Sequence, residues 1–149
     1  MKKIGKVIGT FSATKESKSS SPRPKVETLN LIKDFGIEND KFAQKDLDKT
    51  VMLLGLNSYE IALQNGVNLE FGSLGENIIF DFNPHALPIG TILQIGECQI
   101  QIMQKCTMCD HLSIFHKRLP KIVKDCRGLY CKILKNGTIK IDFEVYIKE

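Results

Sequence analysis

Apolar and polar residues alternate over short segments through most of this chain, a pattern typical of half-buried β-strands. The clearest case is residues 91–103, where isoleucines recur in two short strands that turn at Gly96-Glu97. Similar runs predict strands at residues 3–11, 26–32 and 129–134, and a glycine turn at 74–77 leads into another. Many short strands of this kind predict a mostly β protein, folded as a closed or nearly closed β-barrel.

Breaks in the alternation predict the turns and one or two short helices. A helix is expected over residues 58–65, ended by Gly66. Residues 112–117 fit one or two further helical turns, with Pro120 near their end. Asn136-Gly137 predicts a two-residue type I′ hairpin, because both residues tolerate positive φ, and residues 138–147 form its return strand. The charged segment 34–48 is predicted to be a connector.

Composition limits the classes of function. The 149 residues are expected to form a single domain with a core of its own. No apolar stretch approaches the roughly 20 residues of a membrane helix, and the N-terminus lacks the apolar core of a signal peptide, so we expect a cytoplasmic protein without a membrane partner. Five cysteines in a reducing compartment are expected to be buried groups, ligands or nucleophiles, with Cys98 and Cys131 in the core.

The formal charge of +4 is small, and basic residues are interspersed with acidic ones along most of the chain. This distribution argues against a specific nucleic-acid partner and favours small anionic ligands. Residues 12–25 are rich in serine, lysine and proline, which predicts a flexible loop. The sequence leaves open whether its basic residues are a solvated face or part of an anion-binding rim. These residues are Lys15, Lys18, Arg23 and Lys25.

Two thiols three residues apart, Cys106 and Cys109, follow the central predicted strands. Together with His111 and His116 they contain ligands enough for a zinc site, and Cys-x-x-Cys is the spacing of a zinc knuckle. Strong zinc motifs usually add a second, distant pair, which is absent here. A thioredoxin-like dithiol is disfavoured because that motif belongs to a βαβ unit, which the pattern does not show. A zinc-binding module and a cofactor-free interaction module therefore remain alternatives.

Several blocks, in order along the chain, resemble the MOSC domain, named for its occurrence at the C-terminus of molybdenum cofactor sulfurases. Residues 36–41 are similar to the family's Gly-x-x-Gly-Asp-Arg-His block, with Phe42 where the family often has histidine. The segment 72–77 resembles its Gly-x-x-Gly-Glu-Asn turn, and Cys109 with Leu112 its Cys-x-x-Leu step. The last block, Arg-Gly-x-Tyr, corresponds to residues 127–130.

This resemblance implies a β-barrel of the MOSC or pyruvate-kinase-barrel type that binds the molybdenum cofactor, molybdopterin. It implies that Cys109 is the reactive, catalytic cysteine, which either ligates molybdenum or carries sulfur as a persulfide; Cys106 is the second choice of metal ligand. The cofactor's phosphate and pterin need polar partners. The residues that the sequence offers for this are Asp40, Gly75, Asn77, Lys105 and Arg127.

Two activities are compatible with the resemblance, namely reduction of N-hydroxylated compounds and transfer of sulfur or cofactor. Sulfurases of this family carry a pyridoxal-phosphate desulfurase domain, for which 149 residues leave no room. Pyridoxal phosphate is therefore expected only on a separate cysteine desulfurase partner, and an oxidoreductase would need a separate redox partner. The sequence does not choose between the two activities or name the substrate.

Overall fold

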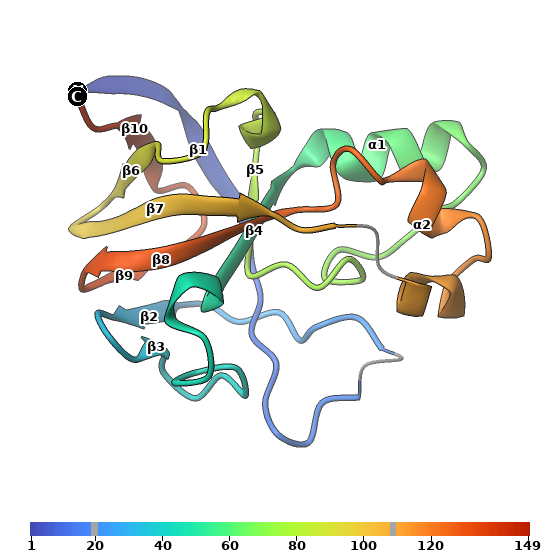
Figure 1. Cartoon of the computed structure of the whole chain (residues 1–149), viewed down its shortest axis with the longest axis horizontal. Helices are drawn as coiled ribbons and strands as arrows, with labels where there is room; N and C mark the ends of the chain where they lie inside the picture. Colours follow the sequence, from blue (N-terminus) through green and yellow to red (C-terminus); the bar gives the residue numbers. More distant parts are fainter. Residues whose placement is uncertain (19–20, 108–109) are drawn as a thin grey trace.

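The computed structural model describes residues 1–18, 21–107 and 110–149. Within these residues, strands close into a mixed barrel, which confirms the predicted fold class (Figure 1). Six of the seven neighbouring pairs around the barrel are antiparallel, and the seventh, β4 with β5, is parallel. In barrel order the strands are β1 (Lys2–Thr10), β10 (Glu144–Ile147), β6 (Ile92–Ile95), β7 (Cys98–Lys105), β8 (Leu129–Lys135), β4 (Val51–Gly55) and β5 (Ile78–Phe80).

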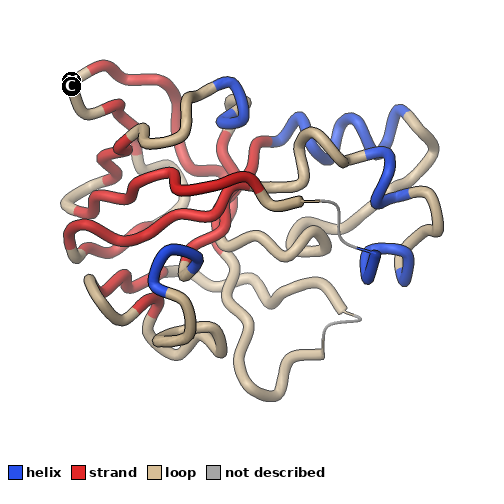
Figure 2. Tube along the Cα trace, viewed as in Figure 1, coloured by secondary structure: helices blue, strands red, loops and turns tan. Residues whose placement is uncertain are grey.

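A small antiparallel sheet and several helices complete the described structure. The sheet has the order β3 (Gly36–Ile37), β2 (Leu29–Ile32) and β9 (Gly137–Ile139). Helices α1 (Leu56–Gln64) and α2 (Leu119–Ile122) lie with the 3₁₀-helix η3 (Asp110–Ile114) on one side of the molecule (Figure 2). The short 3₁₀-helices η1 (Leu47–Lys49) and η2 (Pro84–Ala86) lie in connections. In the part of the chain that the structure describes, no helix is long and apolar enough to cross a membrane.

Strand β4 separates two clusters of buried side chains, which explains why all five of its residues are buried. Val51 and Leu53 pack in the barrel interior, whereas Leu54 packs in the second cluster, beneath α1. A strand covered on both faces has no polar alternation, so its sequence is a continuous apolar run. Strand β7, by contrast, shows the predicted period of two. Cys98 and Cys131 are in the barrel core, as expected.

The predicted hairpin at Asn136-Gly137 is wrong. Neither residue has a positive φ, and β9 pairs with β2 instead of β8, while β10 pairs with β1 and β6. The Asn136 side chain accepts a hydrogen bond from the Lys33 backbone N–H at 2.6 Å. A β-carbon on Gly137 would lie 2.5 Å from the Cys98 nitrogen. Glycine is therefore required there by a close backbone approach and not by a turn conformation.

The predicted helices are present with shifted ends. Helix α1 begins at Leu56 and ends at Gln64, and Gly66 follows with φ +83°. Pro120 lies in the first turn of α2 instead of near the end of a helix. Proline fits there because the first helical N–H groups have no intrahelical acceptor. The charged connector contains the two-residue strand β3 and η1.

Candidate functional site

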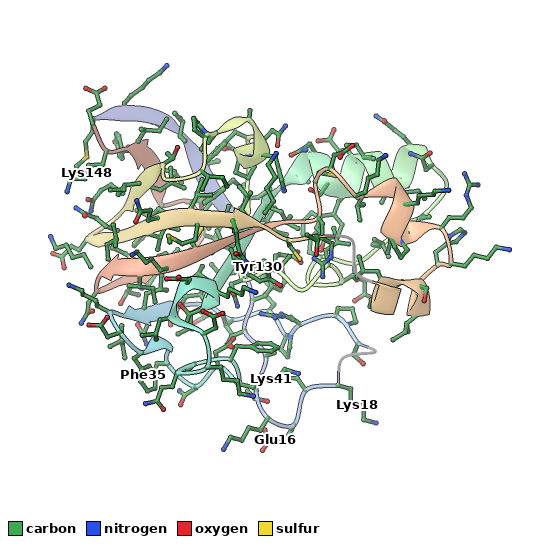
Figure 3. The ribbon with its side chains drawn as sticks, viewed as in Figure 1. Glu16, Lys18, Phe35, Lys41, Tyr130 and Lys148 are labelled. Carbon is green, nitrogen blue, oxygen red and sulfur yellow. The ribbon has the colours of Figure 1, made fainter. Side chains whose placement is uncertain are left out.

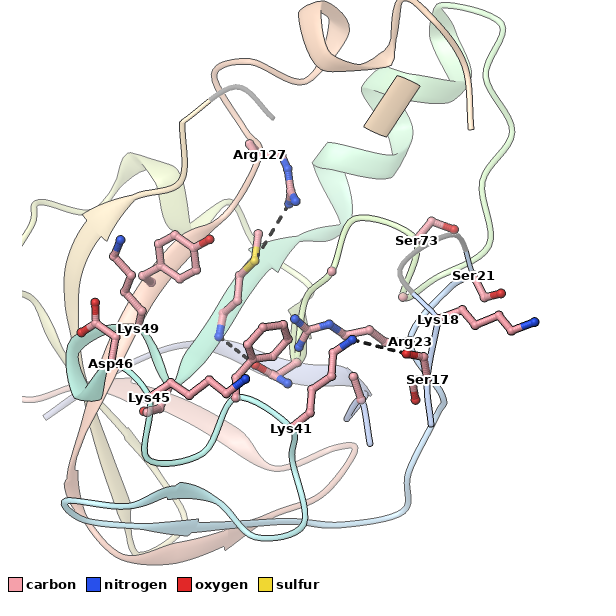
Figure 4. Close-up of a pocket in the computed structure, with 18 residues that line it drawn as sticks. Ser17, Lys18, Ser21, Arg23, Lys41, Lys45, Asp46, Lys49, Ser73 and Arg127 are labelled. Carbon is pink, nitrogen blue, oxygen red and sulfur yellow. Dashed lines mark hydrogen bonds between the residues drawn. The ribbon is translucent and has the colours of Figure 1, made fainter. Parts of the chain in front are cut away.

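A cavity of about 550 Å³ lies where the loop at residues 12–25 and the segment 41–49 face the ends of β4 and β8 (Figure 4). Its lining is strongly cationic, with Asp46 as its carboxylate. Neither of the two ion pairs found among the described residues involves a residue of this lining. A concentration of unpaired positive charge of this kind favours an anionic ligand. The cationic residues are Lys18, Arg23, Lys41, Lys45, Lys49 and Arg127.

Arg127 is the most enclosed of these cations, with 4% of its surface exposed. Its Nη1 donates to the Leu74 carbonyl oxygen and contacts the Met52 sulfur at 3.9 Å. Its Nε is buried and has no hydrogen-bond partner among the described residues. Gly75 has φ +83°, and a β-carbon there would lie 3.6 Å from Nη2 of Arg127. The glycine turn therefore leaves the Arg127 guanidinium accessible from the cavity, and its Nε–H is not used by an acceptor among the described residues.

Arg23 reaches the same cavity wall from the 12–25 loop. A β-carbon on Gly75 would lie 3.9 Å from its Nε, and its guanidinium carbon is 4.9 Å from the centre of the Phe42 ring. Burial lowers the pKa of Arg23, while Asp40 and Glu76 raise it and Arg127 lowers it further. Two partly desolvated guanidinium groups on one wall are a favourable arrangement for a bound anion.

Asp40 is buried and is not part of the lining. Its carboxylate accepts hydrogen bonds from the Ser12 hydroxyl at 2.8 Å, the Phe42 N–H at 2.9 Å and the Ala13 N–H at 3.3 Å. These bonds tie the start of the 12–25 loop to the 41–49 segment. Asp40 therefore fixes the two segments that carry most of the cations.

Asn77 lines the cavity, but both ends of its amide are already engaged. Its Oδ1 accepts from the Met52 N–H at 2.9 Å, and its Nδ2 donates to the Phe11 carbonyl at 3.1 Å and to Asp40 at 3.5 Å. The side chain thus joins β4, the end of β1 and the Asp40 carboxylate. Its contribution to the site is the placement of these groups.

A buried pair, Tyr59 and Glu76, holds the glycine turn and was not singled out from the sequence. Glu76 is fully buried, and its Oε2 accepts from the Tyr59 hydroxyl at 2.5 Å and from the Gly72 N–H at 2.9 Å. Its Oε1 has no partner among the described residues. Burial raises the pKa of Glu76 and that of Tyr59. The Gly-Glu-Asn turn contains Glu76, but its pattern does not indicate the burial of this carboxyl group or its contact with Tyr59.

The remaining candidate residues are placed differently. Lys105 is exposed at the end of β7 and does not line the cavity. The mostly buried Cys106 thiol is 3.5 Å from the Tyr130 hydroxyl, and Tyr130 does line it. Tyr130 lies in the middle of the molecule, above the segment that carries Lys41 (Figure 3). Cys109 lies outside the described residues, as does the side chain of His111. Among the described side chains, no three metal-ligating groups gather.

The sequence model of the MOSC domain matches residues 39–146, which is most of the chain and includes the segments that form the cavity. The chain belongs to the MOSC domain family. This confirms the resemblance seen in the ordered motifs. No curated protein matches the sequence.

Solved structures with the same fold agree with this assignment. YuaD from Bacillus subtilis superimposes with a TM-score of 0.77 at 14% identity, covering 95% of this chain and 93% of that one. YiiM from Geobacillus stearothermophilus gives 0.70 at 16% identity, covering 99% and 75%. YiiM from Escherichia coli gives 0.68 at 17% identity, covering 96% and 70%. At such low identity these likenesses show that the MOSC fold is shared.

One histidine of this MOSC domain is connected to the site through the backbone. The Nε2 of His85 accepts a hydrogen bond from the Gly128 N–H at 3.1 Å, and Gly128 directly follows Arg127. Its Nδ1 is buried without a partner among the described residues. Burial lowers the pKa of His85, and the charge of Lys105 adds to the effect. Protonation of Nε2 would remove the acceptor for Gly128.

We expect His85 to make the fold acid-sensitive. A histidine with a lowered pKa in the folded state contributes stability above its unfolded pKa of about 6.5 and loses it as pH falls through the folded pKa. His85→Gln keeps an acceptor for Gly128 but does not titrate. Urea unfolding between pH 7 and 5 should show a free energy of unfolding that falls less in the variant than in the wild type, by at most about 1.4 kcal/mol per pH unit.

The raised pKa of Glu76 acts in the opposite direction, because stability from a raised carboxyl pKa is lost as pH rises. Wild type and variant share Glu76, so their difference isolates the histidine. His116→Gln is the matched control and should follow the wild type. Identical pH profiles for His85→Gln and the wild type would show that this imidazole does not couple to folding.

Proposed function

We propose that this MOSC domain protein binds a molybdenum cofactor in the cationic cavity. The observation that carries the proposal is the buried Arg127 guanidinium, which faces the cavity beside Gly75 with Nε unused. An unpaired buried charge is costly unless a ligand completes its bonding. A phosphate-bearing pterin would supply that partner, and membership of the MOSC family supports this class of cofactor.

The residues of the cavity suit such a ligand. Arg127 and Arg23 would hold the phosphate, and the Gly75 turn allows close approach. Asp40 and Asn77 would act by placing the surrounding segments. Lys105, exposed at the end of β7, would contribute only long-range charge. We propose Cys109 as the thiolate that ligates molybdenum or carries a persulfide, with Cys106 as its neighbour. When bound, the molybdenum centre would supply two-electron redox chemistry.

Two activities follow from this proposal. A tightly held cofactor would suit reduction of N-hydroxylated compounds, with electrons from a separate redox partner. A loosely held one would suit transfer of sulfur or cofactor, with sulfur from a separate desulfurase that carries its own pyridoxal phosphate. Gel filtration of the loaded protein distinguishes them, because cofactor that remains bound through dilution favours the oxidoreductase.

The direct test is metal and pterin analysis of protein purified from a molybdenum-replete host that makes the cofactor. We expect molybdenum and the pterin in equal amounts. Protein isolated repeatedly with neither would overturn the proposal and favour a cofactor-free interaction module. Zinc in place of molybdenum, released by substitution of either Cys106 or Cys109, would favour the zinc module.

Arg127→Lys is expected to weaken cofactor binding while the protein still folds. Lysine keeps the charge but loses the planar fork, and a charge-assisted hydrogen bond contributes about 1.5–3 kcal/mol. The affinity for the cofactor should therefore fall roughly ten- to a hundredfold. The far-UV circular dichroism spectrum should match that of the wild type. Arg118→Lys, at the exposed start of α2, is the matched control. Undiminished retention in Arg127→Lys would mean that this arginine only supports the Leu74 carbonyl.

A further inference from the structure

Both arginines of the cavity wall are tied to one short turn, residues 72–75. The Nη1 of Arg127 donates to the Leu74 carbonyl oxygen, and the backbone N–H of Arg23 donates to the Gly72 carbonyl oxygen at 3.0 Å. A β-carbon on Gly72 would lie 2.6 Å from the Arg23 carbonyl oxygen, so the two backbones are in close contact. Figure 4 shows Arg23 and Arg127 on different segments of the cavity. The conformation of this turn therefore decides where their two positive charges lie.

The turn is held from the interior by Tyr59. Its hydroxyl oxygen accepts from the backbone N–H groups of Gly72 at 3.0 Å and Leu74 at 3.3 Å. These are the same two residues whose carbonyl groups bond the arginines. Tyr59 donates to Oε2 of Glu76 at 2.5 Å, and the Gly72 N–H reaches that oxygen at 2.9 Å. An edge contact with the Phe71 ring, 4.9 Å between centres, fixes the tyrosine ring. One hydroxyl and one carboxyl group thus set the position of both arginines.

The surroundings of Glu76 fit a neutral carboxylic acid better than a carboxylate. The residue is fully buried, and its Oε1 has no hydrogen-bond partner among the described residues. Neither ion pair found in the described part of the chain includes it. An ionised carboxyl group spreads its charge over both oxygens, so part of the charge would face the interior without a donor, which is costly. Burial raises the pKa of Glu76, and the hydrogen bonds from Tyr59 and Gly72 only reduce that rise.

The charge state of Glu76 decides how much positive charge the wall offers to a ligand. Arg23 is acted on electrostatically by four groups, namely Asp40, Glu76, Arg127 and Tyr130. Carboxylates at both Asp40 and Glu76 would balance the two guanidinium groups. With Glu76 neutral, one positive charge remains for an anionic ligand. The turn is then held firmly without weakening the attraction for that ligand.

We propose that Tyr59 and a protonated Glu76 are positioning residues, which fix the two arginines of the anion site without neutralising them. Neither residue lines the cavity, so the pair acts through the turn at residues 72–75. The inference rests on the proposed function in taking the arginines as ligand-binding groups. It adds how their geometry and their charge are maintained.

The first test is calorimetric titration of the purified, cofactor-free protein with sodium sulfate at low ionic strength and neutral pH, below the melting temperatures of all variants. Sulfate is the probe because it is an oxyanion that arginine binds as it binds phosphate. Tyr59→Phe keeps the ring but removes the acceptor of the Leu74 N–H, and should weaken sulfate binding about tenfold. Glu76→Leu should weaken it at least as much. The conservative variant Glu76→Gln should recover the wild-type affinity to within about twofold, because its amide oxygen accepts the same bonds.

Tyr146→Phe is the matched control, because it removes a tyrosine hydroxyl that bonds the exposed Glu144 outside the cavity. It should bind sulfate like the wild type. An affinity about tenfold higher in Glu76→Gln would show that Glu76 is ionised and competes with the ligand, which would overturn the proposal. Unchanged affinity in Tyr59→Phe, or no sulfate binding by the wild type, would overturn it as well.

Infrared difference spectroscopy tests the proton on Glu76 without any ligand. Exposed carboxyl groups have pKa values of about 4 and are ionised at neutral pH. The carbonyl-stretching band of a protonated carboxylic acid therefore reports a buried group. We expect this band in the wild type and in Tyr146→Phe, and its loss in Glu76→Gln. A wild-type protein without the band at neutral pH would contradict a neutral Glu76.

The outcome is separable from that of the proposed function. Molybdenum and pterin in a purified protein that lacks the infrared band would leave the cofactor proposal standing and remove the neutral acid. The band and the expected order of sulfate affinities, in protein that never carries cofactor, would remove the cofactor proposal and leave Tyr59 and Glu76 as positioning residues of an oxyanion site.

Discussion

Cys109→Ser is expected to abolish molybdenum retention, whereas Cys106→Ser should leave most of the metal in place. A serine hydroxyl stays protonated at neutral pH and is a poor substitute for a soft, anionic thiolate. It also cannot carry sulfane sulfur, so any transfer activity should disappear with the metal. Molybdenum content per protein, measured after purification of both variants and the wild type from the same replete host, gives the comparison.

Cys106 serves as the matched control because it is the other thiol of the same pair. Its sulfur is mostly buried and 3.5 Å from the Tyr130 hydroxyl, and serine can keep a polar contact at that position. A zinc site gives a different pattern, because both substitutions would release zinc and lower thermal stability together. Equal and complete loss in the two variants would contradict the assignment of Cys109 as the single ligand.

The barrel could be predicted because its strands carry a strong alternation, and because a barrel interior requires that alternation. The hairpin could not, since Asn-Gly is a local signal whereas Gly137 is fixed by a tertiary contact with the Cys98 backbone. Local propensity gives way when another strand approaches this closely. Pro120 misled for a related reason, because proline suits a helix start as well as the region after a helix end.

Three of the residues singled out from the sequence, Gly75, Asn77 and Arg127, line one cavity, and so does Arg23 from the 12–25 loop. Their role in binding a ligand stays a prediction. Lys41, Lys45 and Lys49 were not singled out, because the segment that carries them is highly charged and is typical of a solvated connector. Only the fold turns that segment toward Arg127. Lys105 is the last residue of β7, and it is exposed and does not line the cavity.

Tyr59 and Glu76 illustrate what a sequence pattern cannot supply. A carboxylate between a glycine and an asparagine normally indicates an exposed turn, yet Glu76 is fully buried beneath the turn that it holds. Burial of this kind depends on Tyr59 from helix α1, thirteen residues before Gly72. The geometry of the cavity wall therefore depends on the contact of Tyr59 with the glycine turn, and nothing in the sequence pattern of either segment indicates that the two meet.

Asn77→Ala should cause the largest loss of stability among the residues of the cavity wall. The substitution removes the acceptor of the buried Met52 N–H and the donor to the Phe11 carbonyl. Each buried polar group left without a partner costs about 1–3 kcal/mol, so the expected loss is about 3 kcal/mol in the free energy of unfolding. At about 2–4 °C per kcal/mol for a chain of this size, the melting temperature should fall by roughly 6–12 °C.

Asn65→Ala is the matched control, because it removes the same amide from an exposed position where it bonds only the Ile61 carbonyl at 2.8 Å. It should change the melting temperature by no more than roughly 2–4 °C, the shift that a loss of about 1 kcal/mol produces. Cofactor retention should be compared at a temperature well below the melting temperatures of both variants. If Asn77→Ala lost the cofactor but melted like the wild type, its amide would be a direct ligand contact. Because both ends of the Asn77 amide are already hydrogen-bonded within the protein, we expect the other outcome, in which stability is lost. Asp40 then loses its Asn77 contact at 3.5 Å and no longer fixes the segment 41–49.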